Sequence, residues 1–153
     1  MRAQRLIKLV ELADSDLTIN WLTPNLSYEV DEYFENEATR DFLLKHGYEF
    51  NTEKELLAVL SKGSMKEISR EVLQKQGQNL TLTDEEFQDE LKDPDYAASY
   101  YRMRDQLVKE KSIKLQAPIL LYVDNIYWGF AGNRRSNLAW NHDITVKFYV
   151  VTL

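Results

Sequence analysis

The sequence predicts an α+β domain in which a small mixed β-sheet is covered by helices. Apolar residues alternate with period two in the C-terminal part of the chain, which is typical of strands. The middle of the chain instead repeats apolar residues at helical spacing between acidic residues. With 153 residues, the chain has the length of one domain and can bury a substantial core. We therefore expect a single domain over residues 1–153.

The C-terminal stretch begins with a predicted β-hairpin. Residues 119–123 and 126–130 alternate as strands, and both faces of the first strand are apolar. Asp124 and Asn125, between the two strands, tolerate the left-handed backbone of a tight turn. Gly132 then interrupts the second strand, and a glycine there permits a sharp turn and the close approach of another group.

A short helix and a closing strand follow the hairpin. The spacing of Leu138 and Trp140 predicts a helix over residues 133–141, with Asn133 as its N-cap, and residues 144–150 alternate as a strand. Arg134 and Arg135 lie in the first turn of this helix, where a cation is unfavourable by about 0.3–1 kcal/mol. Backbone N–H groups at that end attract anions, and a guanidinium binds phosphate through two hydrogen bonds. The pair therefore indicates a phosphate site; alternatively, both arginines are solvated or paired with some of the chain's 25 acidic residues.

These residues resemble the superfamily of ParB N-terminal domains and sulfiredoxins. The similarity consists of Pro118 before a strand, the hairpin, a Gly132-Asn133-Arg134-Arg135 box (the arginine box), Ala139 in the helix and a closing strand. It implies a ParB/sulfiredoxin-like sheet, with a motif-bearing core at residues 93–153 and a helical insertion at 27–92. It also implies that Gly132, Asn133, Arg134 and Arg135 bind the phosphates of a nucleotide, with a nucleoside triphosphate and Mg²⁺ as the expected cofactor, or of nucleic acid. Sulfiredoxin chemistry is excluded, because Asn133 stands at the position of the reactive cysteine and the chain has no cysteine.

Composition restricts the function further. The net charge of −6 argues against sequence-independent binding along duplex DNA, but not against a local basic site or a basic protein partner. Without cysteine, thiolate metal sites and disulfides are excluded, and His46 and His142 are far apart in the sequence. No apolar run approaches the length of a membrane span, and the first residues lack the apolar core of a signal peptide. We expect a cytoplasmic protein without membrane contact.

The first part of the chain is less regular. Residues 5–12 fit either a strand or a helix, and the ParB resemblance favours a strand. Alternating Leu17, Ile19 and Trp21 predict a strand that ends at a turn at Pro24-Asn25.

Residues 27–92 are predicted to be helical, polar and rich in acidic residues, and either to cover the sheet or to form a surface for a protein partner. Within them, Gly47 is expected to end one helix, residues 65–73 to form a short amphipathic helix, and residues 74–81 a polar linker. Thr83 and Glu86 form a capping box.

A basic helix precedes the motif-bearing core. Asp93 and Pro94 predict its start, and it runs to about residue 111. Its basic residues are explained by solvation and by the favourable position of cations near a helix C-terminus. Arg102 or Arg104 would join Arg134 and Arg135 in one anion pocket if the helix packs beside the box.

No catalytic residue can be named from the sequence. Glu29, Asp31 and Glu32 follow the Pro24-Asn25 turn and matter for chemistry only if they face the box. Tyr122, Tyr127 and Trp128 suit the core better than base stacking. Three functions stay open: a phosphate-binding protein in a DNA-associated process, a nuclease or nucleotide-dependent phosphotransferase of the same superfamily, and a non-catalytic interaction or inhibitor module. The first also predicts that Arg135→Ala removes ligand binding and leaves the fold intact.

Overall fold

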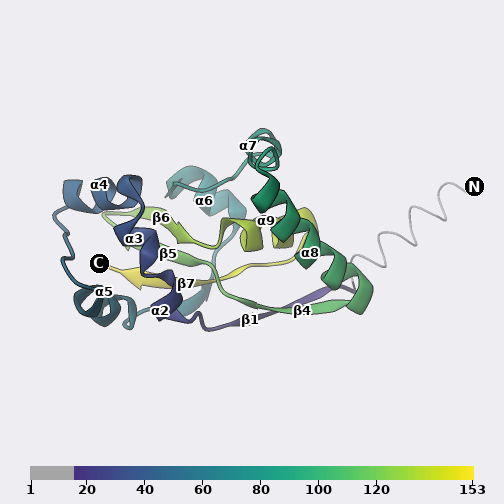
Figure 1. Cartoon of the computed structure of the whole chain (residues 1–153), viewed down its shortest axis with the longest axis horizontal. Coiled ribbons are helices and arrows are strands. Elements are labelled where there is room, and N and C mark those ends of the chain that lie inside the picture. Colours follow the sequence, from purple (N-terminus) through teal and green to yellow (C-terminus); the bar gives the residue numbers. More distant parts are fainter. Residues whose placement is uncertain (1–15) are drawn as a thin grey trace, which may run out of the picture.

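The computed structural model describes residues 16–153 and has a mixed five-stranded sheet at its centre (Figure 1). The strand order is β2-β7-β5-β6-β3, in which β5 pairs antiparallel with β6 and parallel with β7. The outer strands pair antiparallel, β2 with β7, and parallel, β3 with β6. These strands are β2 (Ser64–Glu67), β3 (Gly77–Gln78), β5 (Ile119–Val123), β6 (Ile126–Ala131) and β7 (Lys147–Thr152). The expected α+β class with a small mixed sheet is confirmed.

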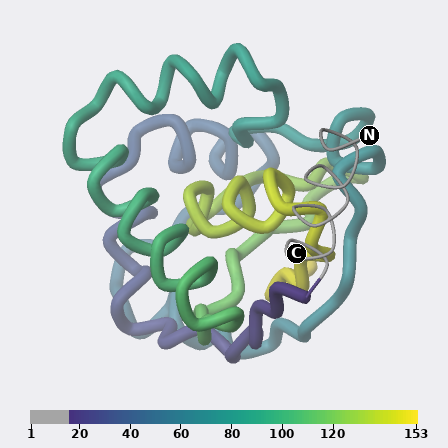
Figure 2. The backbone as a smooth tube through the Cα atoms, turned by 90° about the vertical axis from the view of Figure 1, so that its right-hand side faces the viewer, coloured from purple at the N-terminus to yellow at the C-terminus, as the bar shows by residue number. Residues whose placement is uncertain are grey.

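Helices cover both faces of the sheet. Residues from α3, α4 and α5 form one core cluster with one face, and residues from α6, α7, α8 and α9 form a second cluster with the other. Helices α8 and α9 pack side by side, as Figure 2 shows. The helices are α2 (Leu26–Glu29), α3 (Asp31–Phe34), α4 (Glu37–Lys45), α5 (Glu53–Leu60), α6 (Arg70–Gln76), α7 (Asp84–Glu90), α8 (Pro94–Glu110) and α9 (Asn133–Asn141).

The central strands have two apolar faces, as their sequence predicts. In β5, Leu121 packs in the cluster of α3 to α5 and Leu120 in the cluster of α8 and α9. In β7, Tyr149 packs in the cluster of α3 to α5 and Phe148 packs in the cluster of α8 and α9. Successive side chains of a strand point to opposite faces, so a strand covered on both sides must be apolar throughout.

The hairpin between β5 and β6 is formed as predicted. Asp124 and Asn125 have positive φ angles of 49° and 66°, the left-handed backbone that a two-residue turn requires. Asp124 also contacts α4, since its Oδ2 lies 2.7 Å from Nδ1 of His46. The hairpin is therefore held by its local turn and by one contact to a distant helix.

A two-stranded parallel sheet lies beside the main sheet. It joins β1 (Thr18–Leu22), predicted from the sequence, to β4 (Ser112–Gln116), a strand that was not predicted. The preceding helix begins as predicted, with Asp93 as N-cap and Pro94 at its first position. It ends at Lys111, whose φ of 64° turns the chain into β4. The predicted segment 5–12 lies outside the described residues.

Two predictions between residues 61 and 81 were wrong. Residues 65–73 do not form one helix: Met65 belongs to β2, and α6 begins only after its N-cap Ser69, which accepts the N–H of Val72. The predicted linker contains the end of α6 and strand β3, which pairs with β6. In both places pairing with a distant strand overrides the local pattern. The capping box of Thr83 and Glu86 is present.

The last strand also begins later than predicted, at Lys147 instead of residue 144. Asp143 has a φ of 54°, and the N–H of Ile144 bonds to the carbonyl of Ala139, which closes α9. Residues 144–146 therefore form the connection between the end of α9 and the start of β7. Among residues 16–153, none of the helices has the length and apolarity needed to cross a bilayer.

Candidate functional site

The candidate site lies where β6 passes into α9. Gly132 has a φ of 96°, which side chains disfavour, and a Cβ placed on it would lie 2.7 Å from Cα of Pro118. Glycine is therefore required for the turn and for the close approach of the start of β5. Both the sharp turn and the close approach of another group at Gly132 were predicted from the sequence.

Helix α9 covers the predicted residues 133–141, but its N-cap differs from the prediction. Its N-cap is Gly132, and Asn133 is its first helical residue, so the assignment of Asn133 as the N-cap was wrong. The reason is the positive φ of Gly132, which already turns the chain. No side chain caps the helix, while the N–H groups of Arg135 and Ser136 bond to the carbonyl of Gly132. The backbone N–H groups of Asn133 and Arg134, the first two helical residues, can therefore donate to an external acceptor.

The Asn133 side chain is engaged inside the protein. Its Oδ1 accepts the N–H of Thr81 at 3.2 Å, and its Nδ2 donates to Oγ1 of Thr81 at 3.1 Å. Thr81 is buried, at 3% exposure. Asn133 therefore fixes the segment after β3 against α9.

Arg135 is also held by the fold. Its Nη1 donates to the carbonyl of Gln116 at 2.8 Å, and its Nη2 lies 3.5 Å from Oε1 of Glu29. The side chains of Arg135 and Glu29 are only 17% and 16% exposed. Burial lowers the pKa of Arg135, and the carboxylate of Glu29 opposes this shift. Arg135 thus joins α9 to β4 and α2. These contacts replace the expectation from the sequence that Arg135→Ala leaves the fold intact, because the substitution removes both of them.

Arg134 has a different environment. It is exposed, and its guanidinium lies over the ring of Tyr96 on α8, 5.6 Å from the ring centre. It forms no ion pair with residues 16–153. Of the two adjacent arginines, only Arg134 presents an unpaired guanidinium.

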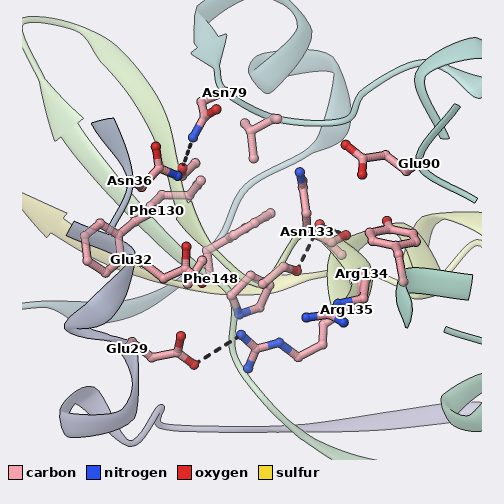
Figure 3. A pocket seen from close by; sticks show the side chains of 18 of the residues that line it. Glu29, Glu32, Asn36, Asn79, Glu90, Phe130, Asn133, Arg134, Arg135 and Phe148 are labelled. Carbon is pink, nitrogen blue, oxygen red and sulfur yellow. Dashed lines mark hydrogen bonds and ion pairs between the residues drawn. The ribbon is translucent and has the colours of Figure 1, made fainter. Parts of the chain in front are cut away.

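A cavity of about 500 Å³ lies against the arginine box; we call it the box cavity. Glu29 and Glu32 reach toward it from α2 and α3, across from α9, and Glu90 approaches from α7 (Figure 3). Its lining includes the whole arginine box, Asn36, Asn79, Leu80, Tyr96, Met103 and Phe130. The cavity is therefore bordered by α2, α3, α7, α8, α9 and strands of the main sheet.

Acidic residues outnumber basic ones around the box cavity. Glu29, Glu32 and Glu90 line it together with Arg134 and Arg135. Burial raises the pKa of the Glu32 carboxyl, and the charge of Glu29 raises it further, while the two arginines act in the opposite direction. A carboxyl with a raised pKa beside guanidinium groups is a candidate proton acceptor or donor.

Tyr96 lines the cavity, and its ring packs against the guanidinium of Arg134. Its hydroxyl is buried without a hydrogen-bond partner in the described part of the chain. Burial and the charge of Glu90 raise the pKa of Tyr96 to about 12, while the neighbouring Asn137 side chain, which is outside normal hydrogen-bond geometry, and the charge of Arg134 act in the opposite direction. The phenol therefore stays neutral near pH 7, and its ring is a fixed surface for the guanidinium.

Other predicted contacts lie elsewhere. Helix α8 does pack beside the box, which was the condition for this prediction. It lines the cavity with Tyr96, Ser99 and Met103, however, and neither Arg102 nor Arg104 belongs to the lining. Arg104 instead lies over Tyr101 and contacts Asp105. The reason is helical phase, because positions 96, 99 and 103 share a face that excludes 102 and 104.

Trp128 is a core residue. It is 8% exposed, stacks on Phe42 with ring centres 4.2 Å apart, and donates from Nε1 to Oγ1 of Thr39. It cannot stack a nucleotide base in this arrangement. His142 is the C-cap of α9, and its Nδ1 lies 3.0 Å from the carbonyl oxygen of Leu138.

Sequence reasoning missed Tyr96, Glu90 and Asn79 as cavity residues. Tyr96 has the helical spacing of an apolar face together with Tyr100 and Met103, and Glu90 and Asn79 have no distinguishing pattern in an acidic, polar region. Glu29 and Glu32 were considered on the condition that they face the box, and the structure meets that condition. Within residues 16–153, no three His, Cys, Asp or Glu side chains are grouped to hold a metal ion.

Comparison of the chain with protein-family models, with curated proteins and with solved structures found no match. The resemblance to the ParB/sulfiredoxin superfamily therefore rests on the arginine box and the elements that flank it.

Proposed function

We propose that the chain binds a nucleotide through a phosphate group, held by Arg134 and the first turn of α9 in the box cavity. The observation that carries the proposal is the state of Arg134. It borders the cavity, is positioned by the Tyr96 ring, and has no carboxylate partner in the described chain. An anion there would offset the unfavourable position of a cation at a helix N-terminus, and uncapped N–H groups would share in binding it.

The shape of the site favours a small ligand over a nucleic acid. Its volume of about 500 Å³ lies within the range of small-molecule sites, about 300–1,000 Å³. A net charge of −6 opposes the many phosphate contacts of a duplex. The similarity to ParB-like domains supports the same ligand class and a role in a DNA-associated process.

Thermal unfolding with a panel of nucleotides and short oligonucleotides tests the proposal. A ligand at 100 times its dissociation constant stabilises the fold by about 2.7 kcal/mol, so the melting temperature should rise by several degrees. Arg134→Ala should remove this shift. The matched control is Arg102→Ala, which removes an exposed arginine of α8 outside the cavity and should leave the shift intact.

The other outcomes are informative. A shift with oligonucleotides only would transfer the proposal to nucleic acid. No shift with any of these ligands would contradict phosphate binding and would favour a protein-interaction module that uses the acidic helices between residues 27 and 92.

A second candidate function is a phosphoryl-transfer or hydrolytic reaction on the bound nucleotide. The observation that favours it is Glu32, a carboxyl with a raised pKa in the same cavity as Arg134. Glu32 would accept a proton from the attacking hydroxyl or water while Arg134 stabilises charge on the phosphate. Release of phosphate that is lost in Glu32→Gln, while nucleotide binding persists, would support this function. Binding without turnover in the wild-type chain would contradict it.

A further inference from the structure

We infer that the box cavity selects a ligand with one phosphate group and a hydroxyl-bearing sugar, a nucleoside monophosphate, over the corresponding nucleoside triphosphate. This inference rests on the proposed function and specifies its substrate class. It departs from the triphosphate with Mg²⁺ that the ParB resemblance implies.

The first argument is charge. Three carboxylates, Glu29, Glu32 and Glu90, line the cavity against the two guanidinium groups of the box. The pair between Arg135 and Glu29 uses one of those cations inside the protein. What is left for a ligand is Arg134 and the N–H groups of the first turn of α9. This set suits one phosphate group, and each further phosphate would meet the negative charge of Glu32 and Glu90.

The second argument is the wall that faces α9. Glu32 and Asn36 lie there (Figure 3), and the Asn36 Oδ1 already accepts the N–H of Thr39, so that its amide nitrogen can donate. Carboxylate oxygens accept from sugar hydroxyls, and an amide donates to them. A ligand with its anion at Arg134 would therefore direct hydroxyl groups toward Glu32 and Asn36.

The third argument concerns the remaining lining and the metal. Leu80 and Met103 are partly exposed apolar side chains of the cavity, a surface that accepts a planar base. A triphosphate would need Mg²⁺ to offset its charge, and Mg²⁺ prefers carboxylates that are free to coordinate. Glu29 is paired with Arg135, which leaves Glu32 and Glu90 as the other carboxylates of the lining. Without Mg²⁺ bound to one of them, a triphosphate would face their uncompensated negative charge.

Calorimetric titration of the full chain provides the test. The ligands are the four common nucleoside monophosphates, the matching triphosphates with and without Mg²⁺, the nucleosides, and inorganic phosphate. We expect at least one monophosphate to bind about tenfold more tightly than its triphosphate, its nucleoside and inorganic phosphate, a difference of about 1.4 kcal/mol. Glu90→Gln should narrow the gap between monophosphate and triphosphate. The control Glu85→Gln neutralises an exposed carboxylate of the same helix outside the cavity, and should leave the gap unchanged.

Each other outcome overturns the inference. If a triphosphate binds as tightly as the monophosphate or more tightly, and Arg134→Ala abolishes that binding, the selectivity is wrong while the proposed nucleotide function stands. If inorganic phosphate equals the monophosphate, the sugar contacts are wrong. If no nucleotide binds, the inference and the proposed function fall together.

Discussion

Replacing Arg135 should destabilise the protein, whereas replacing its neighbour Arg134 should not. Arg135→Ala removes a charged donor from the carbonyl of Gln116, a bond of 2.8 Å, and leaves Glu29 without its partner at 3.5 Å. A hydrogen bond from a charged group contributes about 1.5–3 kcal/mol. Breaking a fully buried ion pair costs about 3–5 kcal/mol, and this one is discounted because both side chains keep some exposure.

Together these terms give a loss of roughly 3 kcal/mol for Arg135→Ala. At this chain length each kcal/mol lowers the melting temperature by about 2–4 °C, so a decrease of roughly 6–12 °C is expected. For Arg134→Ala, loss of the cation–π contact with Tyr96, about 0.5–1 kcal/mol, is offset by removal of a cation from a helix N-terminus, about 0.3–1 kcal/mol. Its stability should stay within about 0.5 kcal/mol of wild type.

Urea unfolding followed by circular dichroism measures both variants. A double-mutant cycle with Glu29→Gln then isolates the ion pair, for which we expect a coupling energy of about 1 kcal/mol. A free energy of unfolding for Arg135→Ala within about 1 kcal/mol of wild type would refute the structural role of Arg135, because removing a residue that joins α2 to β4 should cost more than that. So would a larger loss in Arg134→Ala than in Arg135→Ala.

Three further predictions concern the backbone, the pH response and a helix cap. Gly132→Ala should lower the free energy of unfolding by about 2 kcal/mol or more, because Gly132 has a positive φ and its Cβ would collide with Pro118. Gly47 also has a positive φ but has open space around it, so Gly47→Ala should lower the free energy of unfolding by about 1 kcal/mol. Urea unfolding of the two variants measures this difference. The folded state raises the pKa of Glu32, so ionisation of this carboxyl lowers the stability of the fold as pH rises. Glu32→Gln should therefore raise the melting temperature near pH 7 and lose this advantage below about pH 4, where the carboxyl is protonated in both states. A gain in melting temperature that does not depend on pH would contradict the raised pKa. Thr83→Ala should cost about 1 kcal/mol in the same unfolding assay, since it removes the cap of α7, and an unchanged midpoint would count against that cap.

Elements with local causes could be predicted from the amino-acid sequence. Alternating apolar residues defined β5 and β6, and Asp124 and Asn125 defined the turn between them, because these residue types tolerate a left-handed backbone. Gly132 marked the end of β6 and the start of α9 for the same reason. The cap at Asp93 fixed the beginning of α8. In each case a few neighbouring residues carry the whole cause.

The different environments of the two arginines follow from contacts between distant segments and could not be predicted from the sequence. Nothing local distinguishes Arg134 from Arg135, yet the fold buries one between Glu29 and the carbonyl of Gln116 and leaves the other open to the cavity. The strands β2 and β3 likewise exist through pairing with β7 and β6, and their own sequences favoured a helix and a linker. Contacts between segments far apart in the chain depend on how the sheet brings them together, so a pattern read along the sequence does not contain them.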